Sequence, residues 1–297
     1  MLNMDPSLKC FVVTATLVLL VGCVSPPAVE RVRPDYWTRQ LTETALTTGD
    51  ASEQTSTFLS LRGWGRKALR DPEPVLRALR EQLVRDPDRV GLTAFAELAY
   101  LSGRQAKHAD RRVAYLLTAA RASYAVLFDP GMGPMLDPFD PNLRFAADLY
   151  NYSLSLLTDI LLDARDTSLD VNDLEMIEGR LQIRRGKGVA GEPAMSEILV
   201  AFSYKTNELR HHNRRRGIGV PVVVVRPRPP IMEGRGHRHP PVREVAIGPA
   251  TMLLRFRDPW RESGPVFKAD SELINTLSTT HVEVGGRQIP LEADTSL

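Results

Sequence analysis

The sequence predicts an α+β protein, with a helical domain over residues 35–165 and a small mixed or β domain over residues 175–297. Apolar residues recur at helical spacing throughout the first stretch. Short β-branched runs bounded by glycine and proline replace that spacing in the second stretch. The length of 297 residues fits two modest domains, since one domain takes roughly 100–200 residues. The hydrophobic fraction, 43%, is that of an ordinary globular chain.

A leader precedes both regions. Residues 10–22 carry no charge and would rise about 20 Å as a helix, which is short of the roughly 30 Å hydrocarbon core of a membrane. This length predicts a signal peptide over residues 1–22 rather than a spanning helix. The sequence Leu-Val-Gly-Cys at positions 20–23 resembles the lipobox of bacterial lipoproteins. The resemblance implies cleavage before Cys23 and lipidation of its sulfur. The alternative is an ordinary secretory signal with an unmodified cysteine.

Lipidation of Cys23 would have consequences for the rest of the chain. The other cysteine, Cys10, lies in the leader, so the mature chain would hold no disulfide, redox pair or cysteine-based metal site. Three acyl chains, the usual load of a bacterial lipoprotein, anchor far more firmly than one. Val24, in place of aspartate, favours the outer membrane by resemblance to lipoprotein sorting in diderm bacteria. Residues 23–34 are expected to form an extended tether, because they include two consecutive prolines.

Capping residues and one-sided apolar stripes predict the helices of the first domain. The last helix opens on Asp140-Pro141, an N-cap followed by proline at the first helical position. Leu-Ala-Tyr at 98–100 and the spacing between successive helix starts give the helical bundle a weak likeness to tetratricopeptide repeats of about 34 residues. The alternative is a bundle without a repeat. The expected helices cover residues 35–46, 52–61, 73–84, 93–101, 110–128 and 141–164.

The second domain is predicted to be rich in strands. Gly285-Gly286 is a favourable two-residue hairpin turn. Residues 226–241 are rich in proline and glycine and are expected to form an exposed loop. The expected strands cover residues 181–183, 198–202, 220–225, 251–256, 281–284 and 287–291.

The sequence contains no familiar catalytic or cofactor-binding motif. It lacks a G-x-S-x-G nucleophile elbow, an H-E-x-x-H zinc motif, a P-loop and a dinucleotide-binding glycine pattern. The net charge of +2 argues against nucleic acid as a partner. His237 and His239 are placed to face one ion, with His211, His212 or His281 as further ligands, but neighbouring arginines oppose cation binding. We therefore expect no metal and no cofactor.

A basic cluster precedes the strand expected at 220–225. It consists of Arg210 and Arg214, Arg215 and Arg216. We expect these side chains to pair with carboxylates of a neighbouring element. The alternative is contact with the phosphates of anionic lipid headgroups. The candidate carboxylates are Asp148, Glu175 and Glu178.

The helix expected at 141–164 also carries polar residues of interest. Asn151 lies between two tyrosines, and because asparagine is a modest helix former we expect its amide to be buried and bonded to backbone. Asp159 and Asp163 are four residues apart and share a face. We expect this pair to belong to a solvated polar face, and an acid–base pair is the alternative.

Five segments together resemble the N-terminal region of long bacterial lipoproteins of the α/β-hydrolase class. In that family a helical region and a small strand-rich region precede the hydrolase domain. This chain ends at Leu297, before the domain that would carry the catalytic serine, so we expect no catalytic residue in it. It would be either a truncated or split product or an accessory region that stands alone. The segments are residues 42–48, 95–103, 148–154, 216–221 and 282–294.

The expected role is therefore that of an envelope-anchored, non-catalytic accessory region. Its expected partners are the membrane, through the lipid anchor, and a hydrolase domain or another envelope protein. An independent protein-interaction lipoprotein is the main alternative, and an unrecognised enzyme is a further one. The candidate functional residues, taken from the most distinctive segments, are Asp148, Tyr150, Asn151, Arg214 and Arg216, of which all but Arg214 are candidates for an enzyme's site.

Overall fold

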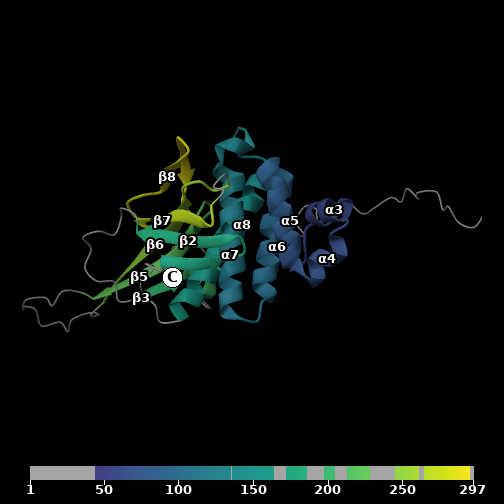
Figure 1. The fold of residues 1–297 in the computed structure, drawn as a ribbon. Coiled ribbons are helices and arrows are strands. Elements are labelled where there is room, and N and C mark those ends of the chain that lie inside the picture. Colours follow the sequence, from purple (N-terminus) through teal and green to yellow (C-terminus); the bar gives the residue numbers. More distant parts are fainter. Residues whose placement is uncertain are drawn as a thin grey trace, which may run out of the picture. The chain divides into compact units, whose positions relative to one another are not determined.

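Helices come first along the chain and a curled, mixed β-sheet follows them, which confirms the α+β class (Figure 1). The computed structural model describes residues 44–134, 136–163, 172–185, 197–204, 213–227, 245–260 and 264–294. The leader, Cys23 and the tether lie outside these residues, as do His237 and His239. The predicted domain boundary also falls mostly in an undescribed stretch, 164–171, and both sequence-defined regions contribute to one compact unit, 42–297.

The described helices largely follow the predicted ones. Ser52 caps α3 by accepting a hydrogen bond from the backbone N–H of Thr55. Helix α6 is longer than predicted, because Asp88 accepts from the N–H of Gly91 at 2.6 Å and so starts the helix four residues earlier. The end of the helix predicted at 35–46 is a turn at residues 44–48. The helices are α3 (Glu53–Leu61), α4 (Gly65–Arg70), α5 (Pro72–Arg85), α6 (Arg89–Gln105), α7 (Ala109–Phe128) and α8 (Pro141–Asp163).

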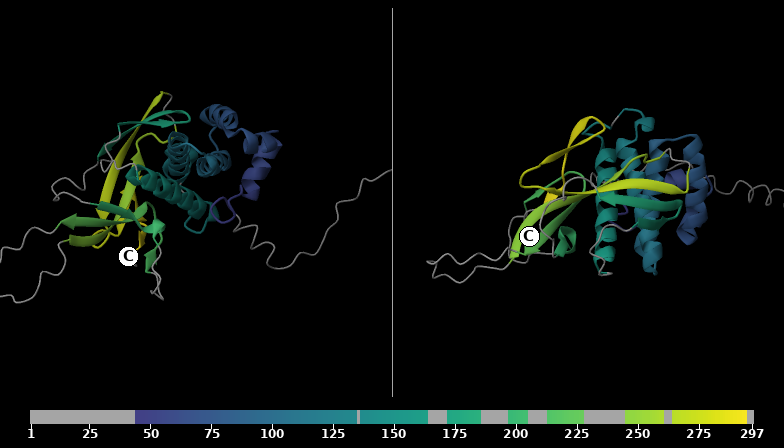
Figure 2. Two further views of the ribbon diagram at one scale, coloured as in Figure 1. Left: turned by 90° about the horizontal axis from the view of Figure 1, so that it is seen from below. Right: turned by 60° about the vertical axis from the view of Figure 1, so that its left-hand side comes forward.

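Helices α6 and α7 are buried on nearly every side along their central turns. Helices α3 and α5 pack against α6, α8 packs against α7, and strands of the sheet contact α7 and α8. Figure 2 shows the strands on one side of these helices. The alanine-rich sequence of α7 suits this position, since small side chains let neighbouring elements approach from several directions.

The main sheet has the strand order β1-β2-β7-β6-β5-β3. Only the β2–β7 pair is parallel among the described pairs of this sheet, and the others are antiparallel. Its strands are β1 (Asn172–Met176), β2 (Gly179–Arg185), β3 (Glu197–Val200), β5 (Val220–Pro227), β6 (Val245–Phe256) and β7 (Val266–Asn275). Two small pairs complete the fold: β8 (His281–Val284) with β9 (Arg287–Pro290), and β4 (Arg214–Arg215) with β10 (Ala293–Asp294).

The hairpin predicted around Gly285-Gly286 is confirmed. Both glycines have positive φ, 59° and 78°, as a type I′ turn requires. The strand predicted at 198–202 is correct only in its first part, because residues 201–203 form a 3₁₀ turn. Strand β7 was not predicted, since its lysine, aspartate and glutamate disfavour strands in isolation.

No helix in the described part of the chain is both long enough and apolar enough to span a bilayer.

Candidate functional site

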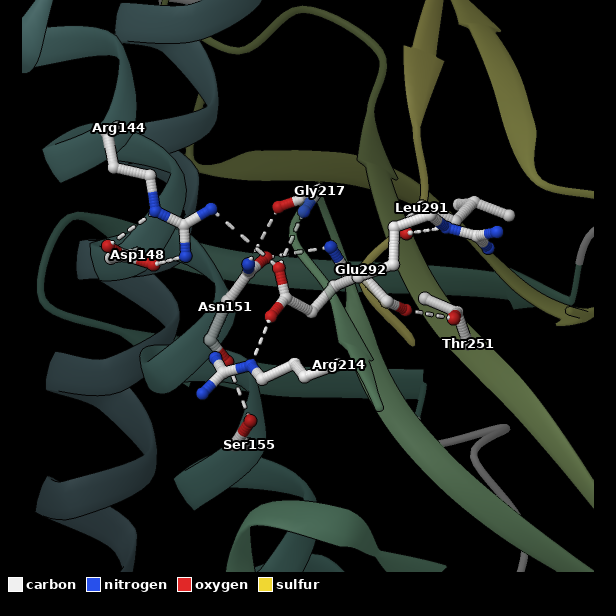
Figure 3. Close-up of polar contacts among 11 residues, drawn as sticks. Arg144, Asp148, Asn151, Ser155, Arg214, Gly217, Thr251, Leu291 and Glu292 are labelled. Atoms are coloured by element: carbon white, nitrogen blue, oxygen red, sulfur yellow. Dashed lines mark hydrogen bonds and ion pairs between the residues drawn. The ribbon is translucent and has the colours of Figure 1, made fainter. Parts of the chain in front are cut away.

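Three of the predicted candidate residues, Asp148, Tyr150 and Asn151, lie on α8. Figure 3 shows Arg214, on β4, opposite Asp148 and Asn151. Together with Arg144, Gly217 and Glu292 they link α8 to the C-terminal segment. We call the set Arg144, Asp148, Asn151, Arg214, Gly217 and Glu292 the junction. The fifth candidate, Arg216, is exposed beside it.

The centre of the junction is Glu292, whose side chain is 0% exposed. One carboxylate oxygen, Oε1, accepts from Nε of Arg214 at 2.7 Å. The other, Oε2, accepts from the backbone N–H of Gly217 at 2.6 Å and lies 3.8 Å from Nη1 of Arg144. A buried carboxylate is stable only when paired and hydrogen-bonded, and here donors from separate parts of the chain meet that need.

The predicted pairing of the basic cluster is therefore corrected in its partner. Arg214 pairs with Glu292, which the sequence argument did not name. Glu178 binds Arg80 and Arg121 instead, and Glu175 is exposed. The position of Glu292 between Leu291 and Ala293 could have indicated that its carboxylate is buried. Its pairing with Arg214 could not be read from the sequence, because only the tertiary structure brings the two together.

Asp148 pairs with Arg144, four residues earlier on α8. Nε of Arg144 donates to Oδ2 of Asp148 at 2.8 Å, and Nη2 donates to Oδ1. Burial nevertheless raises the pKa of Asp148, and the negative charge of Glu292 adds to the effect, while Arg144 and Arg214 oppose it. The charged form of Asp148 is thus less favoured here than in water.

The amide of Asn151 is buried and bonded to backbone, as the sequence predicted. Nδ2 donates to the carbonyl of Gly217 at 3.0 Å, and Oδ1 accepts from the N–H of Gly219 at 2.7 Å. Both of these glycines are required by their surroundings. A Cβ on Gly217 would lie 2.2 Å from the carbonyl oxygen of Pro290, and Gly219 has a φ of +99°. The Arg-Gly-Ile-Gly sequence therefore permits close backbone contact.

Replacing Asn151 with leucine is expected to lower the free energy of unfolding by about 2–5 kcal/mol, because two buried backbone groups lose their partners. Urea unfolding followed by circular dichroism measures this. Ser155→Ala is the matched control one turn along α8, where the hydroxyl donates to a helical carbonyl, and should cost under about 1 kcal/mol. Equal effects of the two substitutions would contradict the assignment.

Tyr150 completes the edge of a strand. Its hydroxyl donates to the carbonyl of Leu254 at 2.7 Å and accepts from the N–H of the same residue at 3.0 Å. The pairing of β5 with β6 ends at Met252, so Tyr150 takes the place of a neighbouring strand just beyond that point. Complete burial raises the pKa of Tyr150 well above the usual tyrosine value.

Tyr150→Phe is expected to lower the free energy of unfolding by about 1–3 kcal/mol, since both backbone groups of Leu254 would be left buried and unpaired. The exchange rate of the Leu254 amide in deuterium oxide should rise by the corresponding factor. A variant as stable as the parent protein would show that the hydroxyl contributes nothing to the attachment of the strand.

A second buried charged group fastens the β1–β2 turn to the helices. Glu178 in this turn binds Nη1 of Arg121 through one oxygen and Nε of Arg80 through the other, the latter at 2.8 Å. The guanidinium of Arg121 also lies 3.8 Å from the ring centroid of Phe267. The N–H of Ile177 donates to the hydroxyl of Thr118 on α7 at 3.2 Å. No local pattern in the sequence singles out Arg121 on α7.

The remaining candidates do not join the junction. Asp159 accepts a hydrogen bond from the hydroxyl of Ser203, and the side chain of Asp163 lies outside the described residues, as do His211 and His212. Nδ1 of His281 lies 2.9 Å from the hydroxyl of Thr280. Among the residues that the structure describes, no group of three or more metal-binding side chains comes together.

Chemically, the junction holds backbone segments in place. Its carboxylates face guanidinium groups and its amide faces backbone. Comparisons with protein-family models, with curated proteins and with solved structures found no match to this chain.

Proposed function

We propose that this chain is an envelope-anchored lipoprotein that serves as the non-catalytic accessory region of an α/β-hydrolase-type lipoprotein. The observation that carries the proposal is the uncharged apolar run at residues 10–22, which leads into Leu-Val-Gly-Cys at positions 20–23. The apolar run is too short to span a membrane, and the cysteine follows it where a lipobox places one. Val24 favours the outer membrane of a diderm bacterium as the location.

The helices supply the scaffold in this proposal. We infer that residues 53–163 act as a helical bundle with weak tetratricopeptide character, which supports the strand-rich part. The packing of α5 on α6, α6 on α7 and α7 on α8 supports such a scaffold. Contacts of α7 and α8 with the sheet would keep the strand-rich part in place.

Mass spectrometry of the protein purified from host membranes tests the anchor. The expected mass is that of residues 23–297 with a diacylglyceryl group and an N-terminal acyl chain. Recovery of an unmodified chain that still begins at Met1 would overturn the proposal. A reading frame for a G-x-S-x-G hydrolase directly after the codon for Leu297 would support the accessory role.

One exposed side chain favours the second candidate, a protein-interaction lipoprotein. Phe139, in the loop between α7 and α8, is 95% exposed. The N–H of Phe139 donates to Oδ1 of Asp137 at 2.8 Å, which holds the turn that presents the ring. Burying this ring against a partner would remove a large apolar surface from water. This candidate would be favoured if the gene that follows the codon for Leu297 were unrelated to hydrolases. It would also require that the chain bind another envelope protein and that Phe139→Ser abolish this binding.

A further inference from the structure

The C-terminal segment 290–294, which we call the strap, is fastened across the start of β5. The N–H of Ile218 donates to the carbonyl of Pro290 at 3.0 Å, and the N–H of Glu292 donates to the carbonyl of Ile218 at 2.9 Å. Residues 293 and 294 then pair with β4. Glu292 is the buried charge of the strap, so its ionic partners decide how firmly the segment is held.

Arg144 lies between two carboxylates. Its Nε and Nη2 bind Asp148, with Nε at 2.8 Å from Oδ2, whereas its Nη1 is 3.8 Å from Oε2 of Glu292. The longer distance is an ion pair rather than a hydrogen bond. The interaction of Arg144 with Asp148 is therefore stronger than its interaction with Glu292, which is a longer ion pair (Figure 3).

Other charged groups around the strap keep their own partners. Arg214 binds Glu292 and lies opposite Asp294 in the β4–β10 pair. Nε of Arg215 donates to the carbonyl of Leu291 at 3.3 Å, and Arg216 is exposed. Of the carboxylates in contact with Arg144, Asp148 is the more exposed, with 22% of its side chain accessible, so protons from solvent reach it more readily than Glu292.

We propose that Arg144 is a proton-controlled arm of the strap: when Asp148 takes up a proton from solvent, Arg144 is released from it and moves toward Glu292, which tightens the strap. The only covalent change is the new O–H bond of Asp148, whose proton comes from solvent. Arg144 stays protonated throughout, since an arginine side chain keeps its proton in proteins.

The direction of the pH dependence follows from Asp148. Burial raises the pKa of Asp148 in the folded chain above its value in the unfolded chain. The folded chain therefore binds this proton more tightly, so Asp148 favours folding increasingly as the pH falls through its folded pKa. Acidification should therefore tighten the strap. The inference goes beyond the proposed function and does not depend on the lipid anchor.

Hydrogen exchange of the detergent-purified full chain tests this. The reporters are the backbone amides of Gly217, Ile218, Leu291 and Glu292, each hydrogen-bonded within or beside the strap. Protection is the exchange rate of an unstructured amide divided by the observed rate at the same pH. It should rise about three- to tenfold as the pH falls from neutral to the lowest value at which the amides of α6 and α7 stay fully protected. The protection of α6 and α7 amides provides the reference for global stability.

Substitutions separate the arm from a general pH effect. Asp148→Asn should show high strap protection at both pH values, and Arg144→Gln should show low protection at both. Glu81→Gln, which removes an exposed i,i+4 partner of Arg85 on α5, is the matched control and should behave as the parent chain does. A wild-type strap that loosens in acid, or an Asp148→Asn chain that keeps the parent's pH response, would overturn the proposal. Should a variant fail to fold, the wild-type pH series alone decides.

Discussion

Cys23→Ser is expected to abolish incorporation of labelled palmitate and to move the protein from the membrane fraction to the soluble fraction. A serine hydroxyl cannot form the thioether that would carry the diacylglycerol. The acyl chains would then be lost, and each buried methylene contributes about 0.8 kcal/mol to membrane binding. Labelling of cells, followed by fractionation and gel electrophoresis, measures both effects.

The chain provides a matched control for this substitution. Cys10 is the other cysteine, and it lies in the leader that we propose is cleaved off before Cys23. Cys10→Ser should therefore keep both the label and the membrane location. Label retained by Cys23→Ser, or lost from Cys10→Ser alone, would show that the lipid is not attached where we propose.

Glu178→Ala is expected to lower the free energy of unfolding by about 3–5 kcal/mol, because it leaves a buried guanidinium without its counter-charge. Arg121 is 0% exposed, and its Nε and Nη2 make no hydrogen bond with the described part of the chain, so Glu178 is its main polar partner there. Denaturant unfolding, followed by fluorescence and by circular dichroism, measures the loss.

Two further variants separate the charge effect from lost packing. Replacing Arg121 and Glu178 together with leucine should cost less than Glu178→Ala alone, because the fully buried guanidinium of Arg121 is removed with its partner. Arg80, the other partner of Glu178, has a side chain that is 22% exposed and can reach solvent. Glu81→Ala removes an exposed partner of Arg85 and should change stability by under about 1 kcal/mol. If the double replacement is the more damaging, the attachment of the β1–β2 turn depends on shape rather than on charge.

Local patterns in the sequence predicted the helices and the terminal hairpin well. Helical periodicity and caps located α5, α7 and α8 to within a residue or two, and two adjacent glycines located the β8–β9 turn. Strand β7 was missed because several of its residues are polar and have low strand propensity. Pairing with β2 and β6 stabilises these residues in the strand. Propensity describes a residue alone, whereas a central strand is stabilised by its pairing.

The junction could be predicted only in part. The sequence indicated Asp148, Asn151 and Arg214, and it predicted a buried amide bonded to backbone. It did not indicate that residues 292 and 214, separated by 78 positions, form an ion pair. It also did not identify Arg121, since no local feature distinguishes this buried arginine from Arg111, an exposed arginine of the same helix. Such ion pairs join residues that are distant in the sequence, so no short-range sequence pattern predicts them.

Three of the segments on which the proposed family resemblance rests, 148–154, 216–221 and 282–294, meet at the junction. Asn151 binds the glycines of the second segment, and Glu292 of the third binds the N–H of Gly217. Their distinctive residues thus have a physical role in joining helices to sheet.

The central claim is that buried polar contacts make the helices and the sheet one cooperative unit. Hydrogen exchange with mass spectrometry across a urea series tests it most directly, by comparing amides of α6 and α7 with those of β5 and β6. We expect both groups to lose protection at one urea midpoint, and Glu292→Ala to lower that midpoint equally for both. Strand amides that unfold at a lower urea concentration than the helices, with Glu292→Ala moving only the strands, would contradict the claim.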